Sequence, residues 1–496
     1  MKFRLLVILV AILMSHSALW AAEKKTPPVA STGMGWITVK VHPPEAFVKI
    51  GKWPLPPDKR ERLQRSAGTY AISATKDHYT LEEISVDLRA GEHKIVELKI
   101  IPIPSKFHKK AMTKALAGEA RYQYKLARMY RYGKGVAQSD KEAVRWYRKA
   151  AEQGHIGAQA NLGYMYNSGK GIERNYEEAV RWYQKAASQG SEMAQVNLGV
   201  NYQSGKGVAR DYGEASKWYR KAAGQGNMTA QANLAQLYYA GKGVARDYGE
   251  ASKWYRRAAE QGQAKSQTKL GNMFYAGKGV DKDYEEAAMW YREAAEQGYA
   301  RAQYDLGAMY ELGKGVNQDY KEAVKWYRQA AEQNDAKAQA TLADKYFDGK
   351  GVPQDYKEAV VWLRKSATQG YARAQANLGF MYVNCKGISQ DYKEALKWLR
   401  KAAAQGYGAG QSNLGKMFEN GLGVERDYEE AAKWYLRAAS QGNAEGQASI
   451  ARLHANRSIK LTEGLRWIDK ALASSPAKAT FLDTKGWLLF KMCRYS

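Results

Sequence analysis

Leucine and tryptophan return at a fixed spacing along most of this chain. Nine leucines stand 36 residues apart, and nine tryptophans keep the same interval. A period of this size, kept without an insertion, is typical of a helical solenoid, in which each repeat buries its apolar face against its neighbours. The two series are Leu126, Leu162, Leu198, Leu234, Leu270, Leu306, Leu342, Leu378 and Leu414, and Trp146, Trp182, Trp218, Trp254, Trp290, Trp326, Trp362, Trp398 and Trp434.

Each period predicts a first helix that ends in a glycine-rich loop. Ala158, Leu162 and Met165 are spaced so that they share one face of a helix. The loop that follows contains Gly169 and Gly171, and glycine accepts the positive φ that a tight connection requires. We therefore expect this helix to turn back against a second one.

The second helix of each period carries signals for both of its ends. Ser139 stands at the expected start with Glu142 three residues later, a spacing that resembles a capping box and recurs with Asn or Asp in place of Ser. Trp146 and its alanine neighbours should face the core. Glycine ends most of these helices, and Asn334 replaces it once, because both residues tolerate the left-handed conformation.

Residues 35–100 follow a different pattern, in which apolar and polar residues alternate between turn signals. Such alternation is typical of strands with one buried face. Five short strands in this length predict a small antiparallel sandwich, followed by a linker at Pro102 and Pro104. The expected strands cover 36–41, 46–50, 69–74, 84–88 and 93–98.

The first 22 residues have the layout of a secretory signal peptide. Lys2 and Arg4 precede a short apolar run, and small residues follow at Ala18, Ala21 and Ala22. The run is too short to span a bilayer comfortably. We therefore predict a periplasmic or secreted protein, with anchoring by an uncleaved N-terminal segment as the alternative.

Two segments resemble known families. The stretch from Val41 to Gly51, with Ala67 to Ile72 after it, is similar to the PEGA domain, although the Pro-Glu-Gly core stands here as Pro44-Glu45-Ala46. The repeats, with the pattern Ala-Gln-x-x-Leu-Gly-x-Met-Tyr, Asp-Tyr-x-Glu-Ala and Trp-Tyr-x-x-Ala-Ala, resemble the Sel-one-like repeat, a relative of the tetratricopeptide repeat. The first resemblance implies a β-module without chemistry. The second implies a scaffold in bacterial envelope assembly, signalling or host contact.

These patterns together predict a mainly α protein, an α/α solenoid preceded by a small β-sandwich domain. The solenoid is a superhelix of 36-residue helix-turn-helix repeats. The expected divisions are a signal peptide at 1–22, a PEGA-like sandwich at 35–101, a linker and capping helix at 102–117, nine Sel-one-like repeats at 118–441, and a degenerate repeat with a tetratricopeptide-like segment at 442–496.

Neither composition nor motifs point to an enzyme or to a cofactor. The net charge of +27 is spread among acidic residues rather than gathered in one run, so it favours anionic envelope components but no specific nucleic acid. The Gly-Lys-Gly loops join helices and lack the Ser or Thr of a phosphate-binding loop. The seven histidines are scattered, without metal-ligand spacing. A hydrolase related to disulfide-rich β-lactamase or penicillin-binding repeat proteins remains the alternative, although the Cys pair of each of those repeats is missing here.

The predicted binding surface is the groove of the solenoid, and its expected occupants are proteins or peptides. The residue before each first-helix leucine should face this groove, and an amide there could donate to and accept from a peptide backbone. A generic polar wall is the competing interpretation. The candidates are Asn161, Asn197, Asn233, Lys269, Asp305, Thr341, Asn377 and Asn413.

The C-terminal end offers a second contact. Cys385 and Cys493 should lie too far apart to pair with each other. The final helix is expected to expose Trp487, Leu488 or Phe490, which predicts self-association through this end, with Cys493 as the residue for an intermolecular bond.

Overall fold

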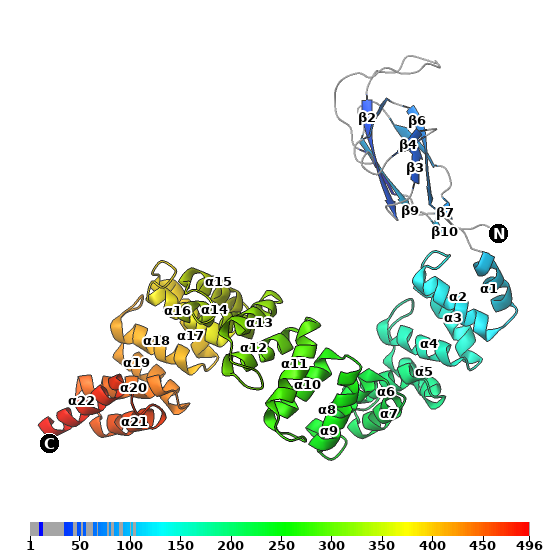
Figure 1. Cartoon of the computed structure of the whole chain (residues 1–496). Coiled ribbons are helices and arrows are strands. Elements are labelled where there is room, and N and C mark those ends of the chain that lie inside the picture. Colours follow the sequence, from blue (N-terminus) through cyan, green and yellow to red (C-terminus); the bar gives the residue numbers. More distant parts are fainter. Residues whose placement is uncertain are drawn as a thin grey trace. The chain divides into compact units, whose positions relative to one another are not determined.

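The computed structural model describes residues 9–12, 34–42, 47–50, 53–55, 63–66, 68–76, 79–80, 84–88, 93–99, 101–102 and 106–495 (Figure 1). Of the predicted signal peptide, only Leu9–Ile12 falls within these ranges, and the rest of it lies outside them. The chain divides into two compact units, Met1–Ala230 and Gln231–Ser496.

The described strands form two sheets. One has the order β1-β9-β2-β5, and the other has the order β10-β7-β6-β3-β4 with β8 paired to β6. Strands lie at all five predicted segments, but β2 and β9 run parallel, which departs from the expected antiparallel arrangement. Two neighbouring parallel strands need a long connection between them. Here the chain from β3 to β8 forms that connection. The sandwich itself stays a prediction. The strands are β1 Leu9–Ile12, β2 Met34–His42, β3 Phe47–Ile50, β4 Trp53–Leu55, β5 Leu63–Ser66, β6 Gly68–Lys76, β7 Tyr79–Thr80, β8 Ile84–Leu88, β9 His93–Lys99 and β10 Ile101–Pro102.

From Lys106 onward the described chain is helical, and tandem helix pairs form a solenoid, as predicted. After α1, even-numbered helices from α2 to α20 are the first helices of the repeats, and odd-numbered helices from α3 to α19 are the second helices. The helices are α1 Lys106–Leu116, α2 Ala120–Tyr132, α3 Asp140–Glu152, α4 Ile156–Ser168, α5 Tyr176–Ser188, α6 Glu192–Ser204, α7 Tyr212–Gly224, α8 Met228–Ala240, α9 Tyr248–Glu260, α10 Ala264–Ala276, α11 Tyr284–Glu296, α12 Ala300–Leu312, α13 Tyr320–Glu332, α14 Ala336–Asp348, α15 Tyr356–Thr368, α16 Ala372–Val383, α17 Tyr392–Ala404, α18 Gly408–Asn420, α19 Tyr428–Ser440, α20 Ala444–Arg457, α21 Leu461–Ser474 and α22 Ala479–Tyr495.

The predicted N-terminal cap of the second helix forms, but only half of the capping box does. The Asn175 side chain accepts from the backbone N–H of Glu178 at 3.0 Å. The backbone N–H of Asn175 donates to the carbonyl of Tyr166 in the first helix instead of to the Glu178 side chain. Glu178 is therefore left to pair with Arg181 on the helix surface, at 2.7 Å.

The loop glycines have the positive φ that the sequence predicts. Gly169 ends α4 at φ +72°, and Asn334 adopts φ +68° in the repeat that lacks the usual glycine. Gly171, at φ +68°, also lies against the start of α3 in the preceding repeat. A Cβ there would stand 2.3 Å from the carbonyl carbon of Asp140, a distance that no side chain could occupy.

The largest buried side chains are tyrosines, and the tryptophans beside them are less buried than predicted. Tyr183 and Tyr219 are fully buried, whereas Trp182 and Trp218 are half-buried. A Lys three residues later covers the exposed ring face, with Lys185 Nζ 4.3 Å from the Trp182 ring centroid. Within the nine-residue tryptophan series, only Trp146, Trp290, Trp362 and Trp398 are buried.

The tyrosine is buried because a small residue faces it from the first helix. A Cβ added to Gly163 would stand 2.8 Å from the Tyr183 ring, and one added to Gly199 would stand 2.5 Å from the Tyr219 ring. Glycine thus gives the ring its space, and close packing of the ring against the glycine backbone completes the core.

Buried glutamines cross-link neighbouring repeats. Gln159 is 4% exposed, and its Nε2 donates to the carbonyl of Ala151 at 3.1 Å. Gln189, which follows the second helix of the same repeat, in turn donates to Gln159 Oε1 at 2.8 Å. The same side-chain bond recurs between residues 30 apart in every repeat from Gln153–Gln123 to Gln441–Gln411, at 2.7–3.1 Å. A buried amide has to be hydrogen-bonded. This series of glutamine pairs, the glutamine ladder, therefore explains why Ala-Gln and Gln-Gly keep a constant spacing along the chain.

The last helices differ in part from the prediction. In α22, Trp487 and Phe490 are exposed, and their rings stack with centroids 5.5 Å apart. Leu488 is fully buried, contrary to expectation, because it packs with Ile468 and Phe481. Cys385 and Cys493 are both exposed and are not bonded to each other. Self-association through this end stays a prediction.

His454 in α20 should make folding stability depend on pH. Burial lowers its pKa, with a smaller lowering by Lys460 and an opposing effect of Glu463. The folded state therefore stays neutral where the unfolded chain binds a proton, so stability falls as the pH drops below about 6.5. His454→Phe, which introduces the residue found at Phe418 one repeat earlier, should reduce this fall. Urea midpoints at about pH 7.5 and 5.5 would check it. An equal fall in both proteins would contradict it.

Candidate functional site

The predicted groove residues lie on one surface of the first helices. We call this surface the first-helix face, and define it as the positions of Gly157, Asn161 and Tyr164 in each repeat. Lys269 is exposed, and Asn161, Asn197, Asn233, Asp305, Asn377 and Asn413 are half-buried. Thr341 is an exception, because its short side chain is only 6% exposed and its hydroxyl lies below the surface. It is therefore not available to a partner.

The asparagine series is not uniformly available either. Asn161 accepts from Arg131 Nη1 at 2.7 Å and donates to the carbonyl of Gly157 at 2.7 Å. Asn197 donates to the carbonyl of Met193 at 2.8 Å. An amide that already bonds to its own helix has less to offer a peptide, so a continuous asparagine ladder does not form.

The same position in the first repeat, which the predicted series omitted, is basic. Lys125 in α2 precedes Leu126. Arg121 and Arg128 occupy the other two positions of the first-helix face in this repeat. The guanidinium of Arg128 lies 5.9 Å from the Tyr124 ring centroid. The signal was in the sequence, since Leu126 belongs to the leucine series.

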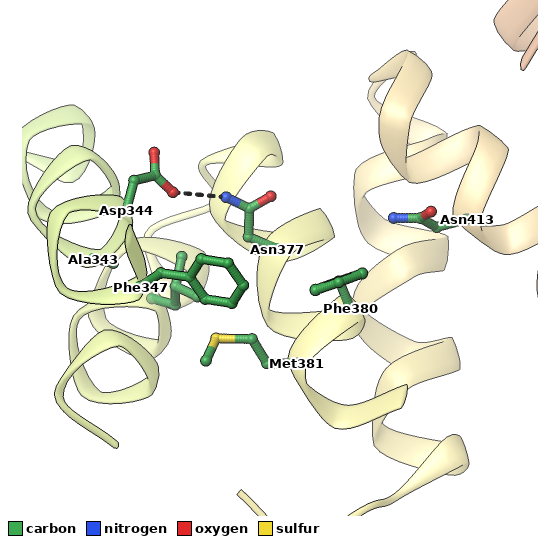
Figure 2. A pocket seen from close by; sticks show the side chains of 8 residues that line it. Ala343, Asp344, Phe347, Asn377, Phe380, Met381 and Asn413 are labelled. Atoms are coloured by element: carbon green, nitrogen blue, oxygen red, sulfur yellow. Dashed lines mark hydrogen bonds between the residues drawn. The ribbon is translucent and has the colours of Figure 1, made fainter. Parts of the chain in front are cut away.

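Asn377 and Asn413 are brought together at a cavity of about 300 Å³ (Figure 2). This volume lies at the lower end of the range for small-ligand sites. Most of its wall is apolar, and three polar side chains complete it. The cavity is lined by Ala343, Asp344 and Phe347 of α14, Leu363 of α15, Asn377, Phe380 and Met381 of α16, and Asn413 of α18.

Asp344 is held in place at one side of the cavity. It pairs with Arg373, and its Oδ1 accepts from Asn377 Nδ2 at 3.0 Å (Figure 2). Burial raises the pKa of Asp344, whereas the positive charge of Arg373 acts in the opposite direction. The carboxylate is thus already neutralised within the protein, and it keeps lone pairs for a further donor.

Two aromatic rings form the apolar part of the cavity. Phe347 and Phe380 lie with ring centroids 6.4 Å apart at an interplanar angle of 66°, and Phe380 is 40% exposed. Asn413 lies opposite Asp344 (Figure 2). An apolar pocket with a few fixed polar groups is suited to binding one side chain of a partner.

Within the described residues, no group of three or more His, Cys, Asp or Glu is arranged to hold a metal ion. No helix in that part of the chain is long and apolar enough to cross a membrane.

Fold and site together define a helical-repeat solenoid of the kind that commonly mediates protein–protein interaction. The Sel1 repeat model matches nine consecutive segments, and the chain belongs to this family. The matched segments are 120–155, 156–191, 192–227, 229–263, 264–299, 300–335, 336–371, 372–407 and 408–443.

Two solved structures are similar to the chain. A Sel1 repeat protein from Oxalobacter formigenes is 35% identical, with a TM-score of 0.52, and the match covers 63% of this chain and 90% of that one. The Escherichia coli protein c5321, described as a protective antigen of uropathogenic strains displaying an SLR fold, is also 35% identical, with a TM-score of 0.47 and coverage of 77% and 90%. No curated protein sequence matches the chain.

Proposed function

We propose that this protein is an exported, non-catalytic scaffold that binds a protein or peptide on the first-helix face of the unit Gln231–Ser496. The cavity lined by Asn377 and Asn413 carries the proposal, since two predicted groove residues there border an apolar cavity. The Sel1 repeat fold is typically a non-catalytic interaction scaffold, which supports the same function. Bacterial envelope assembly, signalling or host contact is the setting we infer.

The export part of the proposal rests on the sequence. The signal-like residues 1–22 and the PEGA-like segment 35–101 favour a periplasmic or secreted protein with a β-module at its N-terminus. Cell fractionation with N-terminal sequencing would test it. A cytoplasmic protein that keeps Met1 would contradict export, and a membrane-bound one that keeps it would favour the uncleaved anchor.

Site-specific photo-crosslinking tests the binding surface. A photoreactive phenylalanine at Asn413 should give a crosslinked product in living cells, because this position borders the cavity. The same group at Val361, which is 45% exposed on the second helix α15, is the control. Equal crosslinking at both positions, or none at Asn413, would contradict binding at the first-helix face.

Nitrocefin hydrolysis tests the non-catalytic assignment. The hydrolase alternative needs a nucleophile with an activating base, and we expect no turnover above the buffer rate. Turnover that survives purification to homogeneity would instead favour the β-lactamase-type function.

A further inference from the structure

The cavity stands where other repeats hold their own tyrosine. In α11, Tyr291 packs against Gly271, and its hydroxyl donates to Asn272 Oδ1 at 2.7 Å. In α13 and α19, Tyr327 and Tyr435 donate to Glu311 and Glu419, which stand at a different first-helix position from Asn272. A buried phenol with an acceptor on the first helix is therefore a recurrent feature of the unit Gln231–Ser496.

The repeat at 336–371 has leucine instead. Leu363 occupies the position of Tyr291 two repeats later. A leucine side chain is shorter than a tyrosine ring and has no hydroxyl. Asp344 occupies the position of Asn272. Its carboxylate can accept from a hydroxyl as Asn272 does, but this repeat has no tyrosine at the position of Tyr291 to donate to it. The space between them is the cavity, since Ala343, Asp344 and Leu363 all line it.

We propose that this cavity binds a tyrosine side chain of the partner, whose ring takes the place that the repeat's own tyrosine leaves empty. The phenol hydroxyl would donate to Asp344. This inference rests on the proposed function and names the residue type that the cavity selects.

The walls suit an aromatic ring. Phe347 and Phe380 line the cavity with their rings 66° apart, and Met381 adds a polarizable sulfur. The extra methyl of Ala343, relative to glycine, is no obstacle, because Ala235 faces a Tyr255 that is still only 5% exposed.

The polar groups favour a phenol over a cation. Arg373 already neutralises Asp344, so a lysine or arginine from the partner would find no unbalanced charge. Asn413 makes no side-chain hydrogen bond within the described residues, and its amide can therefore bond to the peptide backbone beside the tyrosine.

The probe for this inference is p-cresol, the tyrosine side chain without its backbone. We expect p-cresol to shift the Met381 methyl resonance of the full-length protein in a saturable manner. Toluene, which cannot donate to Asp344, should bind about ten-fold more weakly. No shift of Met381 with p-cresol, or equal binding of toluene, would overturn the inference.

Leu363→Tyr should fill the cavity with the chain's own ring and weaken p-cresol binding by about ten-fold or more. Val361→Tyr, the same change on the exposed side of α15, is the control and should bind like the unsubstituted protein. Unchanged binding by Leu363→Tyr would overturn the inference.

A second variant covers the case in which Leu363→Tyr does not fold. Phe380→Ala removes a ring that is 40% exposed, so the core stays intact while the cavity loses one wall. We expect weaker p-cresol binding, and unchanged binding would contradict the proposal. If a partner crosslinks at Asn413 but p-cresol does not bind, the tyrosine specificity alone is contradicted. If no partner crosslinks at Asn413, the proposed function itself is contradicted.

Discussion

Replacement of Tyr219 by alanine is expected to lower the free energy of unfolding by about 3–5 kcal/mol, the range for truncating a large buried aromatic. The Tyr219 ring is fully buried against Gly199, and its hydroxyl donates to Gln203 at 2.7 Å. Alanine would leave a cavity between α6 and α7 that the rigid glycine backbone cannot close.

The neighbouring tryptophan provides the comparison. Trp218 is half-buried, with Lys221 Nζ 4.1 Å from its ring centroid, so Trp218→Ala should cost less than Tyr219→Ala. Urea denaturation measures the total change. Hydrogen exchange of the α6 and α7 amides measures the local one, because a repeat array need not unfold as a single unit. A larger loss for Trp218→Ala would mean that the tryptophans, and not the tyrosines, dominate the core.

Replacement of Glu311 by alanine is expected to cost about 3–5 kcal/mol as well, because it leaves a buried cation without its partner. Lys345 in α14 is only 6% exposed and pairs with Glu311 of α12. The Tyr327 hydroxyl donates to the same carboxylate at 2.8 Å. Urea denaturation of the variant would show the loss as a lower midpoint.

Two further variants separate the charge effect from a general loss of packing. Glu311→Leu with Lys345→Met should recover part of the stability, since an apolar pair of similar size needs no desolvation, although the Tyr327 hydroxyl still loses its acceptor. Glu322→Ala breaks the exposed pair with Lys325 on α13 and should change stability by less than about 1 kcal/mol. A double variant as unstable as Glu311→Ala would show that the unpaired charge of Lys345 does not cause the defect.

The repeat boundaries could be predicted from the sequence because the end of the first helix and both ends of the second helix carry local signals. Asn175 begins α5, and Gly169 ends α4, by hydrogen bonds and backbone angles that depend on a few neighbouring residues. The pairing of the two helices then follows from the leucine series, which can be buried in only one way.

The choice between two adjacent aromatic residues could not be predicted in the same way. Trp182 and Tyr183 both fall within the wide apolar stripe of a second helix, so periodicity alone does not decide which is buried. The deciding contact is Gly163, 20 residues earlier on another helix. The glutamine ladder was missed for a similar reason, because Gln159 counts as polar in any pattern and its partner Gln189 lies 30 residues away.

The cavity has a signal in the sequence that the periodicity alone does not reveal. Leu363 and Leu399 interrupt a series that is otherwise tyrosine. Such an interruption indicates a cavity only if the tyrosine at the same position in other repeats is buried. The structure was needed to show that it is. Thr341 was wrongly predicted to be available in the groove. Its position in the series predicts which way the side chain points, but not whether the side chain is long enough to reach the surface.

The contact between Gly171 and Asp140 bears on how such a chain can evolve. Because each loop is pressed against the preceding repeat, even one added side chain would force two neighbouring repeats apart, and an inserted residue would do so more severely. Duplication or deletion of a complete 36-residue unit leaves every such contact intact. We therefore expect homologous genes to differ in the number of repeats, while variation within a repeat is confined to substitutions.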